Sequence, residues 1–254
     1  MLWTDWEGAI RERKSVRSFQ PEAVEEGKME KLKNFLRQMR VPFEHQVECR
    51  LFRAEQGEGL YPGMDTPPDN VAFVTELDPV SVSKAGFVGE LLLLYAQSLG
   101  ISSCWHGTYR KKWEGAAPVC LSPLGTPAPE RRGLLERVFK AVTVGGRKPL
   151  EELLVRKKGM TINQITNTVQ FALHLARMAP SAYNGQPWRF DVSEDSRTVR
   201  LLLGSGGKSR KWKHQDLDLG ICACHFWLGL TLRGVKPRVE VKEEDGRAAW
   251  TFSL

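Results

Sequence analysis

The chain has 254 residues, of which 41% are hydrophobic and 26% charged, so it has the composition of a globular protein that can bury a sizeable core in one large domain or two small ones. Its formal charge of +7 and pI of about 9.2 favour an anionic partner, such as a phosphorylated cofactor, an acidic surface or nucleic acid, without choosing between them. Five scattered cysteines, an odd number, argue against a disulfide framework and favour a reducing, cytoplasmic location.

The first part of the chain is predicted to contain two amphipathic helices followed by two strands. The first helix begins at Asp5, a favourable N-cap, and its mixture of charges and tryptophans is not that of a secretory signal peptide. A second helix over residues 25–39 has an apolar face and ends before Pro42. Residues 47–52 and 71–75 alternate or run apolar, which predicts two strands.

A third helix is predicted over residues 86–99, where nearly every side chain is apolar. Such a helix is buried on most sides, and Gly100 is a natural residue to end it. Its apolar run is well short of the about 20 residues that a membrane span needs, so we expect no membrane segment. Residues 122–133 are rich in proline and glycine and predict a surface loop or lid, and residues 139–144 predict a strand that closes this half.

The second part of the chain repeats this succession of elements. The predicted elements are a helix, two strands and a second buried helix, at residues 165–176, 188–192, 199–203 and 220–232. The two buried helices begin at Gly86 and Gly220 and end at Gly100 and Gly234, so both pairs of glycines are offset by the same 134 residues. A duplicated module is the economical explanation. We therefore expect two related half-modules, 1–148 and 149–254.

Three short segments carry candidate chemistry. Residues 11–19 gather arginine, lysine and serine at the end of the first helix, and such donors can hold a dianionic phosphate. Residues 179–190 combine turn formers with side-chain amides, whose donor and acceptor suit the edge of a pyrimidine ring. Residues 104–107 end in Gly107, which lets backbone approach a ligand closely. On the residues alone, a solvated basic stretch is the simpler interpretation of the first segment, and a capped turn stays open for the second.

In combination, these segments resemble the FMN-dependent nitroreductase family. Arg13-Lys14-Ser15-Val16-Arg17 is similar to the Arg-Arg-Ser-x-Arg opening of that family, and Pro180 to Trp188 is similar to its Pro-Ser-x-x-Asn-x-Gln-Pro-Trp signature. Residues 99–107 resemble the end of its central dimer helix and its flavin-facing loop, and residues 144–150 resemble its closing strand and basic tail. The resemblance covers most of the chain. It implies an α+β fold, a three-layer α/β/α sandwich in which two half-modules pack around central buried helices.

The order of the motifs departs from that of an ordinary member of the family. The first half-module has the basic motif but no Pro-Ser-x-x-Asn, whereas the second has Pro-Ser-x-x-Asn but no basic opening. This order resembles the branch in which two divergent modules are fused into a pseudo-dimer within one chain. It implies one complete flavin site between the modules, a degenerate second site, and a monomeric protein, with weak self-association as the alternative.

The resemblance also implies a role for each candidate residue in holding FMN. The phosphate would be held by Arg13, Ser15 and Arg147, with Lys14 nearby. Arg17 would lie close to the pyrimidine edge, where a cation stabilises the negative charge of reduced flavin. From the second module, Ser181 and Asn184 would bond the polar edge of the ring. Backbone around Trp105, His106 and Gly107 would face the reactive nitrogen of the flavin, and Tyr183 would narrow the substrate side.

The implied activity is the transfer of electrons from NADH or NADPH through FMN to a small oxidised acceptor of the nitroaromatic or quinone class. No catalytic side chain is expected, because the flavin carries the reaction. The alternative is a flavin- or small-molecule-binding protein of the same fold without efficient turnover. A nucleic-acid binder, supported only by charge and by the cations around Trp212, is a more distant alternative, and we expect no nucleic-acid partner. Cys222, Cys224 and His225 are predicted to be buried structural residues, so no metal site is expected.

Overall fold

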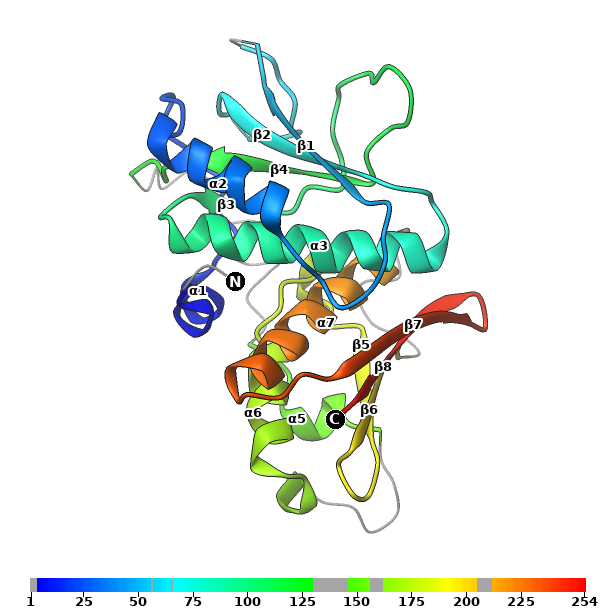
Figure 1. Ribbon diagram of the computed structural model, residues 1–254. Coiled ribbons are helices and arrows are strands. Elements are labelled where there is room, and N and C mark those ends of the chain that lie inside the picture. The colour runs from blue at the N-terminus through cyan, green and yellow to red at the C-terminus, as the bar shows by residue number, and fades with distance from the viewer. Residues whose placement is uncertain (1–3, 56, 65, 130–145, 156–161, 205–211) are drawn as a thin grey trace. The chain divides into compact units, whose positions relative to one another are not determined.

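Figure 1 shows the computed structural model of the protein, which describes residues 4–55, 57–64, 66–129, 146–155, 162–204 and 212–254. The chain divides into two compact units. The first unit comprises residues 1–40, 46–76 and 91–144, and the second comprises residues 41–45, 77–90 and 145–254. Each unit combines helices with an antiparallel sheet of four strands, which confirms the α+β class expected from the sequence.

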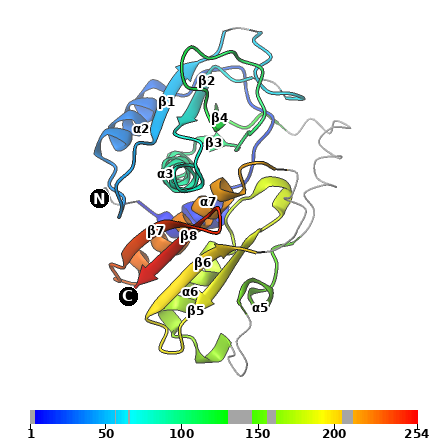
Figure 2. The same cartoon turned by 90° about the vertical axis from the view of Figure 1, so that its right-hand side faces the viewer.

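The sheet of the first unit has a buried centre. Its strands, in spatial order, are β1 (Glu48–Arg53), β2 (Asp69–Val74), β4 (Cys120–Gly125) and β3 (Ser102–Ser103). The helices of this unit are α1 (Trp6–Glu12), α2 (Glu26–Gln38) and the last turns of α3 (Pro79–Ser98). In both views α2 and α3 lie beside the sheet (Figure 1, Figure 2). Every residue of β2 and β4 is buried, so the core of the unit follows these two central strands.

Aromatic side chains join the three helices of the first unit. Phe35 on α2 contacts Trp6 on α1 and Tyr95 on α3, with ring centroids 6.0 and 4.0 Å apart. The start of α1 is confirmed, because the Asp5 carboxylate accepts a hydrogen bond from the Gly8 N–H at 2.8 Å. These contacts hold the first turn of α1 in place, and the basic motif continues from the other end of this helix.

The second unit also combines helices with an antiparallel sheet of four strands. Its strands, in spatial order, are β5 (Trp188–Val192), β6 (Thr198–Leu203), β8 (Arg247–Ser253) and β7 (Arg238–Glu244). Its helical elements are the first turns of α3, α5 (Leu150–Leu153), η1 (Ile162–Gln164), α6 (Asn167–Ala176), η2 (Ala182–Asn184) and α7 (Gln215–Leu232). Phe226 on α7 packs against Phe190 on β5 and Phe252 on β8, with ring centroids 5.7 and 4.9 Å apart, so α7 lies on this sheet.

The two sheets have the same strand order. If the strands of each sheet are numbered 1 to 4 along the chain, their spatial order in both sheets is 1-2-4-3. In each, the long apolar helix, α3 or α7, comes between the second and third strands along the chain. This repetition is consistent with two related half-modules.

Within the second unit, α3 and α7 cross at two glycines. A Cβ on Gly86 would lie 2.1 Å from the carbonyl oxygen of Leu217, and one on Gly220 would lie 1.7 Å from the carbonyl oxygen of Ser83. Neither position can therefore hold a side chain without moving backbone. Ser83 and Leu217 are separated by the same 134 residues as the two glycines, so each helix presents equivalent positions to the other, as two elements do across a two-fold axis.

The predicted starts of the two buried helices are wrong. α3 begins at Pro79 and α7 at Gln215, seven and five residues before the glycines that the sequence suggested as their first residues. Both glycines lie inside helices because the crossing requires them there. Asp78 caps the N-terminus of α3, since its carboxylate accepts a hydrogen bond from the Ser81 N–H at 2.9 Å.

The predicted loop over residues 122–133 is also partly wrong, because residues 122–125 belong to β4. β3 pairs only with Leu124 and Gly125, so Pro123 lies where this side of β4 is open, as a residue without an N–H requires. The sequence prediction omits β8, and the strand predicted at residues 139–144 lies outside the described residues. No helix in the described ranges is long and apolar enough to cross a lipid bilayer.

Candidate functional site

In the first unit, the basic motif lies directly beside the segment that contains Trp105 and His106. The Val16 N–H donates a hydrogen bond to the Ser103 carbonyl at 3.0 Å, and Ser15 and Ser103 form a parallel bridge. Residues 13–17 therefore extend the edge of the sheet at β3. Two of the three candidate segments, which are about 90 residues apart in sequence, are brought together in this way.

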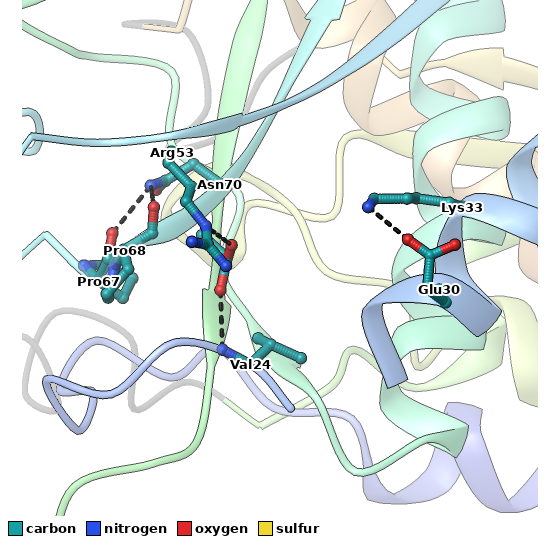
Figure 3. A network of polar contacts seen from close by, with 8 residues as sticks. Val24, Glu30, Lys33, Arg53, Pro67, Pro68 and Asn70 are labelled. Atoms are coloured by element: carbon teal, nitrogen blue, oxygen red, sulfur yellow. Dashed lines mark hydrogen bonds and ion pairs between the residues drawn. The ribbon is translucent and has the colours of Figure 1, made fainter. Parts of the chain in front are cut away.

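The segment after the basic motif is hydrogen-bonded to the same sheet and to the residue that follows β4. The Asp69 carboxylate on β2 accepts a hydrogen bond from the Val24 N–H at 2.8 Å and a longer one from Arg53 at 3.4 Å (Figure 3). The Gln20 N–H donates to the Thr126 carbonyl at 2.9 Å. With α1 before it and these bonds after it, the basic motif is held at both ends.

Cys104 shows that the cations of the motif are close to this segment. Burial raises the pKa of the Cys104 thiol, and the charges of Arg17 and Arg13 and a hydrogen bond with Ser15 oppose that rise. The Cys104 side chain is buried, and its pKa is raised overall, so we assign it no nucleophilic role. Its position places Arg13, Ser15 and Arg17 around the start of the 104–107 segment.

Trp105 and His106 have different partners. The Trp105 ring packs on Phe73 of β2, with ring centroids 4.6 Å apart, and the His106 ring packs on Tyr61 with centroids 4.8 Å apart. Burial and, secondly, the charge of Arg17 lower the pKa of the His106 imidazole to about 4. His106 is therefore neutral at physiological pH.

In the second unit, Arg147 and Asn184 are bonded to each other. The Arg147 guanidinium donates one hydrogen bond to the Asn184 side-chain oxygen and a second to the Met178 carbonyl, both at 2.8 Å. Ser181 is part of the same turn, where its hydroxyl accepts a hydrogen bond from the Gln186 N–H at 3.0 Å. Arg147, Ser181 and Asn184, predicted to be site residues, thus lie together in this unit.

The turn that carries Ser181 and Asn184 is strained. Tyr183, Asn184 and Gln186 have φ values of 54°, 52° and 45°, in the left-handed region that residues other than glycine rarely adopt. Each such residue costs on the order of 1–3 kcal/mol and persists only where its surroundings fix it. The Tyr183 side chain is 52% exposed, so its burial offsets little of this cost. Strain of this kind gathers at functional sites.

Residues that had no assigned role hold this turn in place. The Asp218 carboxylate accepts a hydrogen bond from the Ala182 N–H at 3.1 Å, and the Gln186 side chain accepts one from the Lys148 N–H at 2.8 Å. Gln186 also donates to the side-chain oxygen of Asn184 at 3.3 Å. Gln186 is part of the sequence signature and could have been assigned a role, whereas the part played by Asp218 depends on the fold.

The other residues singled out from the sequence lie in different surroundings. Lys14 and Gly107 are exposed. The Cys-Ala-Cys-His segment is confirmed as buried structure, because Cys222, Cys224 and His225 are fully buried. No group of three His, Cys, Asp or Glu side chains that could hold a metal occurs in the part of the chain that the structure describes.

Replacing Arg147 by methionine is expected to loosen the strained turn. Hydrogen bonds to a charged group contribute about 1.5–3 kcal/mol, so the amides of Asn184 and Gly185 should exchange with solvent at least about tenfold faster. Hydrogen exchange followed by mass spectrometry of peptides covering residues 181–186 measures this. Arg200→Met, on the surface of β6, is the control. Unchanged exchange in Arg147→Met would show that the turn does not depend on this arginine.

Comparison with known proteins identifies the family. A family model described as "Putative TM nitroreductase" matches residues 6–230. A crystal structure described as that of a "putative nitroreductase" from Thermotoga maritima has a TM-score of 0.69 and 18% identity, covering 100% of this chain and 95% of that chain. This similarity shows the fold.

Two further structures match part of the chain. A nitroreductase family protein from Clostridium difficile has a TM-score of 0.43 and 18% identity, covering 60% of this chain and 97% of its own. A nitroreductase from Exiguobacterium sibiricum, solved in complex with FMN, has a TM-score of 0.37 and 13% identity, covering 54% and 97%. No curated protein matches the chain. Because the family model covers most of the chain and the fold agrees with it, the chain belongs to this nitroreductase family.

Proposed function

We propose that this protein is an FMN-dependent oxidoreductase that passes two electrons from NADH or NADPH to a small organic acceptor of the nitroaromatic or quinone class. Membership of the nitroreductase family over residues 6–230 is the observation that carries the proposal. Family membership supports an oxidoreductase that uses flavin. The nicotinamide donor and the acceptor class are finer proposals, which follow from the resemblance of the motifs.

The chemistry of the described residues fits FMN. In the first unit, Arg13, Ser15 and Arg17 lie together beside β3, and guanidinium and hydroxyl groups are suitable donors for a phosphate dianion. Two buried polar atoms of residues 103–106, Ser103 Oγ and His106 Nε2, have no hydrogen-bond partner among the described residues of that unit. A ligand that brings its own polar groups to this segment would supply partners for such atoms.

We propose that residues from both units bind the same FMN molecule. The residues of the first unit are Arg13, Lys14, Ser15 and Arg17, with Trp105, His106 and Gly107. Those of the second unit are Arg147, Ser181 and Asn184. Bound FMN would supply the redox chemistry, accepting a hydride from the nicotinamide and reducing the acceptor. The side chains would bind and orient, and Arg17 would favour the negative charge of the reduced ring.

We also propose that the chain is a fused pseudo-dimer that is monomeric and binds one FMN. The shared strand order and the reciprocal glycine crossing support this proposal. So does the division of the motifs, with the basic segment in one half and Pro-Ser-x-x-Asn in the other. The chain has one basic segment and one Pro-Ser-x-x-Asn segment, which together make one site. The second site of the pseudo-dimer lacks both segments and is therefore degenerate.

The expected result is that purified protein takes up one equivalent of FMN per 28.7 kDa chain, as measured by fluorescence titration and absorbance. Anaerobic NADH or NADPH should bleach the flavin, and a quinone or nitroaromatic should restore its colour. Arg17→Met and Asn184→Ala should each weaken FMN binding by about tenfold, which corresponds to about 1.4 kcal/mol.

The control is Arg50→Met, which removes a half-buried arginine of β1 that pairs with Glu48. It should bind FMN as the wild type does. Uptake without bleaching by either nicotinamide would mean that the protein binds flavin but does not turn over. No uptake by folded protein would contradict the proposed function, and two equivalents would contradict the single site.

A further inference from the structure

The backbone of His106 is held rigidly in the first unit. Its N–H donates to the Leu121 carbonyl at 2.8 Å, and its carbonyl accepts from the Leu121 N–H at 2.9 Å, so it forms a bridge to β4. The imidazole packs against the buried ring of Tyr61. Because both backbone and ring are constrained, the imidazole has one well-defined position.

The polar groups around this imidazole are already used. The Tyr61 hydroxyl donates to the Asn70 side-chain oxygen at 2.7 Å. The Asn70 amide nitrogen donates to the carbonyls of Pro67 at 2.9 Å and Pro68 at 3.2 Å (Figure 3). The tyrosine hydroxyl and the asparagine side chain thus have hydrogen-bond partners of their own, and neither is a partner of His106 Nε2.

The Nε2 atom of His106 has no such partner, and in the described part of the first unit Ser103 Oγ and Trp113 Nε1 share this property. His106 Nε2 is buried, and no described residue of the first unit lies within hydrogen-bond distance of it. A buried nitrogen without a partner costs about 1–3 kcal/mol, and native proteins rarely retain one without a reason. Because the imidazole is neutral at physiological pH, Nε2 can donate a hydrogen bond or accept one, depending on the tautomer.

The charge beside the imidazole indicates what the missing partner is. Arg17 is close enough to affect the ionisation of His106, so a polarised or partly negative oxygen is favoured there. The hydrogen bond between Val16 and Ser103 brings the basic motif to within three residues of His106. The phosphate-binding donors and the imidazole thus belong to one region of the first unit.

We propose that the His106 side chain binds the flavin directly, with Nε2 donating a hydrogen bond to a carbonyl oxygen at the polar edge of the isoalloxazine ring. This inference rests on the proposed binding of FMN. Reduction places negative charge on that edge, so the bond is stronger in the reduced state. His106 then both anchors the cofactor and raises its reduction potential.

The test compares His106→Phe, His106→Gln and Tyr61→Phe with the wild type. FMN affinity is measured by fluorescence titration of the apoprotein, and the flavin midpoint potential by equilibration with a reference dye. His106→Phe should bind FMN about tenfold more weakly and have a more negative potential. His106→Gln, whose amide nitrogen reaches the place of Nε2, should recover part of both.

The thermal stability of the apoprotein separates a binding role from a structural one. His106→Phe removes an unpaired polar atom but keeps an aromatic ring, so the apoprotein should unfold at the same temperature as the wild type or higher. Tyr61→Phe, which loses the bond to Asn70, should unfold at a lower temperature but keep the wild-type potential.

Each outcome decides one question. Unchanged affinity and potential in His106→Phe, with FMN bound, would overturn the proposal for His106 while leaving the proposed function intact. A His106→Phe apoprotein as destabilised as Tyr61→Phe would also overturn it, because an imidazole nitrogen would then have a stabilising partner within the apoprotein. A wild-type protein that takes up no FMN would instead contradict the proposed function itself.

Discussion

Replacement of Gly220 by alanine is expected to lower the free energy of unfolding by about 3 kcal/mol or more, or to prevent folding. The new Cβ would lie 1.7 Å from the Ser83 carbonyl oxygen and 3.0 Å from the Phe87 nitrogen, and both are backbone atoms of a buried helix. Overpacking of a core costs about 1–3 kcal/mol where side chains can move, and more where backbone must. Urea unfolding monitored by tryptophan fluorescence measures the change.

Gly27 provides the matched control. It is also a helical glycine, in α2, but a Cβ there would meet only the tip of the Glu25 side chain at 3.6 Å. Gly27→Ala should therefore be neutral or stabilise the protein by up to about 1 kcal/mol, as expected for helix propensity. If Gly220→Ala were as stable as Gly27→Ala, α3 and α7 would not approach each other as described.

Replacement of Glu90 by leucine is expected to lower the free energy of unfolding by about 3–5 kcal/mol. Glu90 on α3 and His225 on α7 are fully buried, and Glu90 Oε1 lies 2.8 Å from His225 Nε2. His225 Nδ1 lies 3.2 Å from the Leu175 carbonyl, which can only accept, so Nδ1 carries a hydrogen. A single further proton then lies between the carboxyl group and Nε2. Removing the carboxyl group leaves the imidazole without its partner.

Two further variants identify the cause. Glu90→Gln keeps a donor for a neutral Nε2 and should cost much less than Glu90→Leu. The double variant Glu90→Leu/His225→Phe removes both polar groups and should recover most of the stability, because an apolar pair of similar volume can replace a buried polar pair. Equal losses in the leucine and glutamine variants, without recovery in the double variant, would show that packing rather than the shared proton is responsible.

The sequence predicted well those helix ends that are determined by residues at the end itself. Asp5 caps α1, and Gly100 and Gly234 have φ values of 74° and 77° just beyond the two buried helices, as expected of C-terminal glycines. The starts of α3 and α7 were not predictable in this way. Gly86 and Gly220 serve a contact between helices, and sequence periodicity alone does not show which residues meet across such a contact.

β8 was missed although a local signal was present. Asp245 and Gly246 have φ values of 49° and 72°, and an Asp-Gly pair between two alternating segments is a strong signal for a hairpin. β4 was missed for the opposite reason, because Pro123 and Gly125 are typical of loops. Proline is compatible with β4 because β3 is too short to pair with the whole of β4 and leaves Pro123 unpaired on that side.

The candidate site was predictable to the level of its segments. The motif pattern identified the residues that gather beside β3 and those that form the turn after α6. It did not show that Arg147 donates to Asn184 and Met178. An arginine in a basic motif is expected to bind an anion, so hydrogen bonds to protein oxygens were not foreseen. Nor could the motif pattern show the unpartnered nitrogen of His106, which depends on the burial created by distant parts of the chain.

The path of the chain has a consequence for dissection of the protein. The sequence predicts a boundary between the two half-modules near residue 148, whereas the second unit also includes residues 41–45 and 77–90. Its Trp250 ring packs on Phe43 and Phe87, and the indole N–H donates to the Ser83 hydroxyl at 2.8 Å. A fragment beginning at residue 149 would expose this tryptophan and leave its N–H without an acceptor. We therefore expect that the two half-modules predicted from the sequence would not fold as separate polypeptides.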